Sequence, residues 1–526
     1  MKRTINLYFL FLLLFAGSEL FGQGLPVITE GEAYSMNNVA DIESVTPIAQ
    51  GKSIFIGSAY SSSQSLNFQS YWNQVTPENG GKWGSVEGTR GVMNWSGMDA
   101  AYSAAKKYGM LFKQHTLIWG AQQPAWMAAL DTASQRKEIE QWFSLLAARY
   151  PAMDYIDVVN EPLHNAPNGM LPWGSTTKNI DYAKALGGAG KTGCDWIITS
   201  FRMARKYFPN SKLIMNEYGV INSATETQKY IQIVKLLQAD SLIDGIGEQA
   251  HAFSTAGATA ATLKANLDAL AATGVPIYLT EVDIDGTSDL VQLKEMRRVF
   301  PVFWKHPAVK GITFWGYRVG LWRSDQGAFL ITQGGAERPA LKWLKAYVND
   351  TLTNTQSITV SASDGSSAIH KIGGTLNMLA QVLPVNTTIP NITWSISPAG
   401  RATIDSNGLL TTLATGNVIV TATSWDGSGV KGTKVIVVTN TTGIDDKSLA
   451  GQITVYPNPA VNGSFTIKGI ETIKQIELVN MVGEKVRAFT NLNQPSLNIQ
   501  VNVPHGIYVI NFFDGEQYSF KKIIIQ

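Results

Sequence analysis

Eight repeats of a short apolar strand followed by a helical segment occupy residues 46–350, and they restrict the folds open to this chain. Their nearly continuous apolar character indicates strands buried on both faces, which is typical of parallel sheets. Eight right-handed crossovers of this size favour a sheet closed on itself, so we expect a (β/α)8 TIM barrel rather than an open sheet. The expected strands are residues 54–59, 71–76, 111–117, 154–160, 212–217, 244–250, 276–283 and 310–316.

The chain changes character after this region. A polar segment at residues 350–357 leads into short alternating strands, and Asn407-Gly408 between apolar runs predicts a β-hairpin in which both turn residues have positive φ. We expect an immunoglobulin-like β-sandwich over residues 358–440, with Trp394 in its core. A last region, residues 449–526, predicts a second small all-β domain with little apolar mass for its length. The protein is therefore expected to be multidomain, with a TIM barrel followed by two small sandwich-like domains.

The first residues predict an export signal. Lys2 and Arg3 precede an apolar run at residues 7–16, and small and then polar residues follow. This run is too short to span a bilayer, and no other stretch reaches roughly 18 apolar residues. We therefore expect a signal peptide over residues 1–22, an N-terminal leader over residues 23–45 and no transmembrane segment. The mature protein is expected to be secreted or held at the cell surface.

Composition argues against several kinds of partner and cofactor. The 526 residues include 42 basic and 40 acidic ones, and this balance without basic blocks argues against nucleic acid. Cys194 is the only cysteine, so the chain forms neither an internal disulfide nor a thiolate metal cluster. The six histidines lack the H-x-x-x-H spacing of a zinc site, and we expect no metal and no cofactor.

Four glutamates stand at expected strand ends, where (β/α)8 barrels carry their active sites: Glu78, Glu161, Glu217 and Glu281. Glu161 follows Asn160 on the fourth strand and Glu281 lies on the seventh, so the two nearly face each other across the barrel mouth. Hydrolysis of a glycosidic bond needs two such carboxyls, one protonated and one ionised. Spacing leaves open which glutamate has which role. Helix capping or pairing with an arginine also explains a single glutamate at a strand end.

Aromatic, amide and imidazole side chains recur at the same rim. Sugars present apolar C–H faces with hydroxyl edges, and flat aromatic rings bordered by polar groups suit them. Core packing is the better explanation of any one tryptophan, but the recurring set favours a carbohydrate cleft. The set is His115, Trp119, Gln122, Gln249, His251, Trp315 and Trp322.

Seven short motifs lie in order along the barrel region. They are Thr76-Pro77-Glu78-Asn79 with Lys82-Trp83, His115-Thr116-Leu117-Ile118-Trp119, Asp157-Val158-Val159-Asn160-Glu161, Asn216-Glu217-Tyr218, Asp244-Gly245-Ile246-Gly247 with Gln249 and His251, Thr280-Glu281-Val282-Asp283, and Trp315-Gly316. Together they make residues 46–345 resemble glycoside hydrolase family 10, the endo-1,4-β-xylanases and their relatives.

The resemblance assigns the roles that spacing left open. It implies a retaining double displacement with Glu281 as nucleophile and Glu161 as general acid and base, their carboxyls about 5–5.5 Å apart. Asn160 would contact the sugar 2-hydroxyl, and His251, backed by Asp283, would hold the nucleophile ionised. The implied substrate-binding residues are Glu78, Asn79, Lys82, His115, Trp119, Gln122, Gln249, Trp315 and Trp322.

One departure from the family pattern concerns Gly120, which stands where many members carry a second histidine. One hydrogen bond to the sugar on the non-reducing side is therefore expected to be absent or replaced.

The two C-terminal regions also resemble known modules. Residues 358–439 resemble bacterial group 2 immunoglobulin-like domains, on the residues 402–409 and 414–416. Residues 449–526, with Tyr456-Pro457-Asn458-Pro459, resemble the type A C-terminal sorting domain of the type IX secretion pathway. This second resemblance implies a member of the Bacteroidota and export by the type IX secretion machinery. A second sandwich spacer is the alternative.

The leading hypothesis is a secreted endo-1,4-β-xylanase acting on xylan, a β-1,4-linked plant cell wall polysaccharide. An endo-β-1,4-glucanase of the same family would use the same chemistry. A non-catalytic polysaccharide-binding surface adhesin would use the barrel as a lectin. The paired glutamates with their asparagine and histidine neighbours favour the enzyme, since binding alone does not require them.

Overall fold

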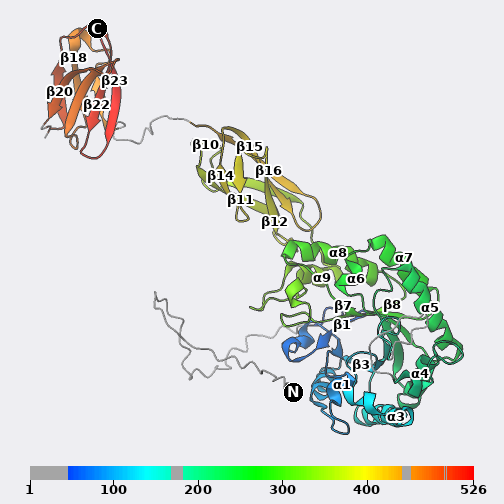
Figure 1. Ribbon diagram of the computed structural model, residues 1–526. Helices are drawn as coiled ribbons and strands as arrows, with labels where there is room; N and C mark the ends of the chain where they lie inside the picture. Colours follow the sequence, from blue (N-terminus) through cyan, green and yellow to red (C-terminus); the bar gives the residue numbers. More distant parts are fainter. Residues whose placement is uncertain (1–45, 168–181, 441–451, 491, 493) are drawn as a thin grey trace, which may run out of the picture. The chain divides into compact units, whose positions relative to one another are not determined.

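The computed structural model describes residues 46–167, 182–440, 452–490, 492 and 494–526 (Figure 1). The expected signal peptide and leader lie outside these residues. The chain divides into two compact units, one ending at Asn349 and the other beginning at Asp350. No helix among the described residues is long and apolar enough to cross a membrane.

Eight parallel strands form a closed barrel in the first unit, hydrogen-bonded in chain order. This confirms the predicted (β/α)8 fold. The second strand begins later than expected. Residues 71–73 lie outside it, and the Asn73 side chain accepts a hydrogen bond from the Ile56 amide at 2.9 Å. The strands are β1 (Phe55–Tyr60), β2 (Gln74–Pro77), β3 (Leu111–Trp119), β4 (Tyr155–Asn160), β5 (Lys212–Glu217), β6 (Gly245–Glu248), β7 (Ile277–Val282) and β8 (Val309–Phe314).

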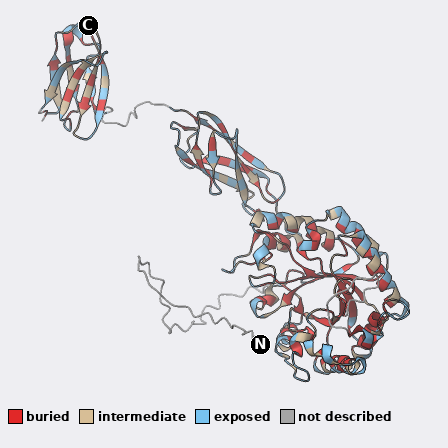
Figure 2. Ribbon diagram, viewed as in Figure 1, coloured by how far each residue is buried: buried red, intermediate tan, exposed pale blue. Residues whose placement is uncertain are grey.

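Helices surround these strands, and Figure 2 shows buried residues along the strands and exposed ones on the outer helix faces. Side chains of Asp131, Ser223, Thr259 and Ser288 cap four of the helices by accepting hydrogen bonds from backbone amides in the first turn. The helices are α1 (Trp83–Val86), α2 (Ser96–Lys107), α3 (Thr132–Arg149), α4 (Asp195–Tyr207), α5 (Ala224–Ala239), α6 (Ala252–Thr255), α7 (Ala260–Ala271), α8 (Asp289–Trp304) and α9 (Pro339–Val348). Short 3₁₀ helices are η1 (Ser62–Gln64), η2 (Phe68–Ser70), η3 (Ala125–Ala129), η4 (Ala183–Leu186) and η5 (Ser324–Gln326).

A cluster of aromatic residues packs where β1 and β8 close the barrel. Phe55 pairs with Gly311 across these strands, and its ring contacts those of Tyr155 and Tyr278 at centroid distances of 5.4 and 6.1 Å. A Cβ atom on Gly311 would lie 2.1 Å from the Phe55 ring. Glycine at this position therefore makes room for the aromatic cluster.

The second unit begins with two facing four-stranded sheets, in the orders β10-β16-β15-β12 and β13-β14-β11-β9. A hydrophobic core that includes Val418, Val420 and Ile436 lies between them, and Trp394 packs on this core while remaining half-exposed. The strands are β9 (Ser357–Ala362), β10 (Ala368–Ile369), β11 (Thr375–Leu383), β12 (Ile392–Ser397), β13 (Ala402–Ile404), β14 (Leu409–Thr412), β15 (Gly416–Ser424) and β16 (Lys431–Val438).

The predicted hairpin at Asn407-Gly408 is present, but its turn differs from the expected type. Only Gly408 has positive φ, at 88°. The Asp405 carboxylate accepts hydrogen bonds from the Asn407 and Leu409 amides, both at 2.9 Å, and so holds a four-residue loop between β13 and β14. Hydrogen bonds to Asp405 therefore hold this turn without a positive φ at Asn407.

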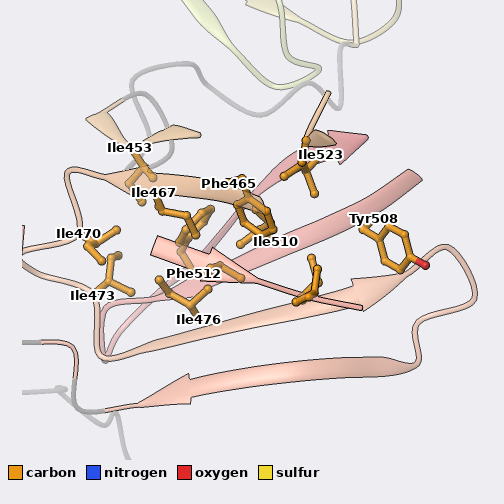
Figure 3. Close-up of a cluster of buried hydrophobic side chains, with 14 of the residues drawn as sticks. Ile453, Phe465, Ile467, Ile470, Ile473, Ile476, Tyr508, Ile510, Phe512 and Ile523 are labelled. Atoms are coloured by element: carbon orange, nitrogen blue, oxygen red, sulfur yellow. The ribbon is translucent and has the colours of Figure 1, made fainter. Parts of the chain in front are cut away.

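The C-terminal region forms a three-stranded sheet, β17-β18-β21, and a four-stranded sheet, β20-β19-β22-β23. The expectation of little apolar mass is wrong here. Alternating residues such as Phe465, Ile467, Ile510 and Phe512 point into one core between the sheets (Figure 3). The strands are β17 (Thr454–Tyr456), β18 (Ser464–Lys468), β19 (Gln475–Asn480), β20 (Lys485–Thr490), β21 (Ser496–Gln500), β22 (Gly506–Phe513) and β23 (Tyr518–Ile525), with η6 (Val461–Gly463).

We predict that Gly311→Ala destabilises the barrel by about 1–3 kcal/mol, because the added methyl group overpacks the site against the Phe55 ring. Urea unfolding followed by tryptophan fluorescence measures this effect, since twelve of the fourteen tryptophans precede residue 350. The matched control is Gly334→Ala, where a Cβ atom meets nothing within 4 Å. Equal stability of the two variants would contradict the packing argument.

Candidate active site

A cavity of about 320 Å³ opens at the carboxyl ends of the barrel strands. Eleven of the fourteen residues expected in the site line it, and Asn165, Tyr218 and Phe253 join them. Glu78, Asn79 and Asp283 lie outside this lining. The eleven are Lys82, His115, Trp119, Gln122, Asn160, Glu161, Gln249, His251, Glu281, Trp315 and Trp322.

Glu161 follows the last residue of β4 and has a positive φ of 54°. Its Oε2 atom accepts hydrogen bonds from Trp119 Nε1 at 3.0 Å and Asn165 Nδ2 at 2.6 Å. Its Oε1 atom accepts from Gln249 Nε2 at 3.0 Å and more weakly from Asn160 Nδ2 at 3.4 Å. These four donors on the carboxyl are all neutral.

Glu281, on β7, has a different environment. Its Oε1 atom accepts from Asn216 Nδ2 at 2.7 Å, and its Oε2 atom lies 3.3 Å from His251 Nε2. Burial by itself raises the pKa of the Glu281 carboxyl, but electrostatic interaction with His115, the hydrogen bond and charge of His251 and the charge of Lys113 outweigh burial and lower that pKa to about 2. Glu281 is therefore ionised at neutral pH.

His251 owes its charge to carboxylates on both sides of its ring. Its Nδ1 atom lies 2.7 Å from Asp283 Oδ2, opposite the contact with Glu281. Burial lowers the pKa of His251, but Asp283 and Glu281 outweigh burial and raise that pKa to about 10. Asp283 also accepts from the Ala252 amide at 2.8 Å and from Trp322 Nε1 at 3.1 Å. Asp283 thus lies behind His251 and orients it.

Asn216, at the end of β5, connects the two sides of the site. Its Nδ2 atom donates to Asn160 Oδ1 at 2.8 Å and to Glu281 Oε1 at 2.7 Å, and its Oδ1 atom accepts from the Thr280 hydroxyl. The sequence named Asn216 only as part of a motif. Its position next to a strand-end glutamate is the signal that could have identified it.

Lys82 forms the centre of a polar corner of the cavity. Its Nζ atom donates to Gln122 Oε1 at 2.7 Å and to Asn79 Oδ1 at 2.9 Å, and it lies 5.3 Å from the centre of the Trp119 ring. Burial lowers the pKa of Lys82, although Glu281, Glu78 and Glu161 attract its charge. Asn79 and Glu78 thus support the lysine from outside the cavity lining.

His115 and Trp315 form the adjoining wall. Buried His115 places its Nδ1 atom 3.0 Å from Asp157 Oδ2 and 3.8 Å from Glu281 Oε1. The Trp315 ring meets the His115 ring edge-on, with centroids 5.1 Å apart. Lys113 also pairs with Asp157, at 2.8 Å. This wall places positive charge beside Glu281.

Glu217, like Glu78, is a strand-end glutamate that does not line the cavity. It is fully buried and accepts hydrogen bonds from the Leu163 and Tyr218 amides at 2.7 and 2.8 Å. Burial raises the pKa of Glu217 to about 7, against the opposing effect of His164. Neither helix capping nor pairing with an arginine accounts for Glu217, whose partners are His164 and the Leu163 and Tyr218 amides.

The sequence analysis assigned no role to His164 or Phe253. His164 lies 2.9 Å from Glu217 and stacks on Tyr218 with centroids 4.2 Å apart. Phe253 is half-exposed and lies between the rings of Tyr218 and Trp322, at 5.7 and 6.3 Å. The only sequence signal that could have identified Phe253 is an aromatic residue two positions after His251. These rings extend the cavity wall on the side of β5 and β6.

Within the described parts of the chain, no three His, Cys, Asp or Glu side chains are grouped so as to hold a metal ion.

Comparison with known proteins gives matches along nearly the whole described chain. The model of Glycosyl hydrolase family 10 matches residues 44–347, that of the bacterial Ig-like domain (group 2) residues 354–437, and that of the secretion system C-terminal sorting domain residues 454–526. The three models occur in the order expected from the sequence.

Individual relatives match the first region. Endo-1,4-beta-xylanase B of Cellvibrio japonicus is 42% identical over 286 residues, which cover 54% of this chain and 44% of that protein. Endo-1,4-beta-xylanase of Agaricus bisporus is 31% identical over 227 residues, 42% of this chain and 63% of that protein. The chain thus spans less than two thirds of either relative. The solved structure of GH10 from Paenibacillus barcinonensis has the same barrel fold, with a TM-score of 0.50 and 23% identity over 59% of this chain and 98% of that one.

The electrostatics of Glu281 lead to a prediction on acid stability. Its pKa of about 2 in the folded chain lies below the ordinary value of 4.5, so its ionisation stabilises the fold above about pH 4.5, and this contribution is lost as the pH falls toward 2. Between pH 5 and pH 3, we expect the unfolding free energy of the wild type to fall by on the order of 2 kcal/mol more than that of Glu281→Gln.

Urea unfolding at the two pH values measures this difference. Glu140→Gln, which alters a partly exposed carboxylate on α3, is the control and should follow the wild type. An identical loss of stability in wild type and Glu281→Gln would show that the charged network around Glu281 does not stabilise the fold.

Proposed function

The chain belongs to glycosyl hydrolase family 10, and from this premise we propose that it is a secreted endo-1,4-β-xylanase that hydrolyses internal β-1,4 bonds of xylan. The observation that carries the proposal is the pair of glutamates in one cavity with contrasting surroundings. Glu281 faces an imidazolium and is held ionised, whereas neutral amide and indole groups surround Glu161. Glycosidic bond cleavage needs this division between two carboxyls.

In the first step, Glu281 attacks the anomeric carbon while Glu161 protonates the departing sugar oxygen. The low pKa of Glu281 supports its role as nucleophile, because only the carboxylate form attacks. His251 donates to Glu281 and keeps it ionised until the covalent bond forms. The family resemblance, together with the neutral donors around Glu161, supports the acid role of that residue.

In the second step, Glu161 is ionised and activates a water molecule, which releases the sugar from Glu281. This sequence requires the two carboxyls to be about 5–5.5 Å apart and gives retention of configuration. Asn216 supports the arrangement, because it donates both to Glu281 and to Asn160, the residue next to Glu161. We propose that Asn160 in turn bonds the sugar 2-hydroxyl, a contact that strengthens in the transition state.

Substrate binding divides between the two sides of the cavity. Lys82, Gln122 and His115 offer polar groups to sugar hydroxyls, and Trp315 offers a flat apolar surface beside them. Glu78, Asn79, Trp119 and Gln249 act mainly by holding these groups and the Glu161 carboxyl. Trp322 borders the cleft beside His251.

Export accords with this function, since plant polysaccharide is met outside the cell. The match to a C-terminal sorting domain implies type IX secretion and a secreted or cell-surface protein. We assign the catalytic domain to residues 46–350, the immunoglobulin-like domain to residues 358–440 and the sorting domain to residues 449–526. The signal peptide proposed over residues 1–22 completes the export route.

The roles of the glutamates are tested by substitution. We expect Glu281→Ala to lower kcat on xylan by about 10⁴-fold or more, because the variant lacks the nucleophile. Xylan affinity should stay within about tenfold of the wild type, since the remaining contacts are intact. Reducing-end release and affinity electrophoresis measure the two quantities, with Glu140→Ala on α3, outside the cavity, as the control. A wild-type protein that retains xylan and never shortens it would establish the adhesin instead.

The substrate and stereochemistry are tested together on purified polymers. We expect linear xylan and arabinoxylan to be cleaved faster than barley β-glucan, and proton NMR to show the β-anomer as the first product. Faster cleavage of barley β-glucan would assign the chain to endo-β-1,4-glucanases. Initial release of the α-anomer would exclude the double displacement.

A further inference from the structure

We propose that Asn165 is a positioning residue for the Glu161 carboxyl, and that Gly120 is glycine because its backbone holds Asn165 within reach of Glu161. The inference rests on the proposed role of Glu161 as general acid and base. The observation behind it is the 2.6 Å hydrogen bond from Asn165 Nδ2 to Glu161 Oε2, the shortest of the four described contacts on this carboxyl.

Local backbone geometry brings the two side chains together. The amides of His164 and Asn165 donate to the Glu161 carbonyl at 3.2 and 2.8 Å, so the segment makes one helical turn immediately after β4. Residues four apart on such a turn lie on the same side. Asn165 is half-buried and lines the cavity, so its amide meets the carboxyl at the cavity wall.

Gly120, at the end of β3, fixes this turn from the other side. Its amide donates to the Asn165 carbonyl at 2.9 Å. A Cβ atom at position 120 would lie 2.2 Å from the Asn165 carbonyl oxygen and 2.5 Å from that of Ala166. Any side chain at position 120 therefore displaces the segment that carries Asn165. The histidine common at this position in the family is thus replaced here by the backbone of a neighbouring loop.

An asparagine suits a carboxyl that changes protonation during the reaction. The Trp119 indole only donates, so it serves only the unprotonated oxygen. Gln249 Nε2 donates to Asn160 as well as to Glu161, so reversing its amide would break the contact with Asn160. The Asn165 amide is free of that constraint. It donates to the ionised carboxyl and, turned over, accepts from the protonated one.

The charged and titratable groups that act on Glu161 come from several elements. Lys82 approaches from the segment before α1, His164 from the turn itself, and Glu217 and Tyr218 from the end of β5. None of them donates one of the four described hydrogen bonds to the carboxyl. A change at position 165 therefore acts directly on Glu161 rather than through an ion pair.

The test uses leaving-group dependence in the full chain. Xylan needs a proton on its departing sugar, whereas a dinitrophenyl xylobioside releases a stable phenolate with little assistance. We expect Asn165→Ala to lower kcat/KM about 10- to 100-fold on xylan and less than about threefold on the dinitrophenyl substrate. Gly120→Ala should show the same pattern more weakly. Equal losses on both substrates, or no loss on xylan, would overturn the proposal.

A pH profile separates positioning from a merely structural role. Asn165→Asp places a second carboxyl beside Glu161. Repulsion between two neighbouring carboxylates disfavours ionisation of both, so one carboxyl of the pair loses its proton at a higher pH than Glu161 alone. The alkaline limb of kcat/KM on xylan should therefore move up by about one pH unit in Asn165→Asp. An unmoved limb in a folded Asn165→Asp variant would count against direct contact during catalysis.

Two controls keep this test distinct from the test of the proposed function. Glu161→Ala must itself show strong leaving-group dependence; if it does not, the acid role of Glu161 is wrong whatever Asn165 does. If Glu161→Ala shows the dependence and Asn165→Ala does not, only the positioning proposal fails. Asn349→Ala removes an exposed amide that donates to the Lys345 carbonyl after α9 and should leave both activities unchanged.

Discussion

Hydrogen bonding between β1 and β8 closes the barrel, and every feature of the candidate active site depends on that closure. Pairing of Phe55 with Gly311 brings the first and last strands together, although they are far apart in the sequence. The carboxyl ends of all eight strands then surround one cavity. Lys82 after β2, Glu161 after β4, Glu281 on β7 and Trp315 after β8 become neighbours only through this arrangement.

Within the cavity, the two glutamates differ because their neighbours differ. Glu281, His251 and Asp283 form a row of alternating negative, positive and negative charges. Each member of the row would be costly to bury alone, and together they satisfy one another. Glu161 instead accepts hydrogen bonds from neutral groups on β3, directly after β6 and on its own turn. Neutral hydrogen-bond donors suit a group that must gain and lose a proton.

Sequence patterns predicted most of the barrel, because strands that are buried on both faces consist of long runs of apolar residues. They were less successful where a single contact decides the structure. Residues 71–73 were expected in a strand but lie outside it, because the Asn73 side chain accepts a hydrogen bond from the Ile56 amide. The sequence assigned no role to His164, which stacks on Tyr218 and pairs with Glu217 in the structure. Such contacts join segments whose separation in sequence gives no periodic signal.

The sequence alone determined the order of the strands, the family and the strand ends that carry Glu161 and Glu281, because these follow from local periodicity and short motifs. Only the tertiary structure decided that Glu217 turns away from the cavity and that Asn165 turns into it. It also decided why position 120 is glycine, since the clash involves the backbone of a loop some 45 residues later. Side-chain direction and the close approach of distant segments depend on packing, which no local pattern contains.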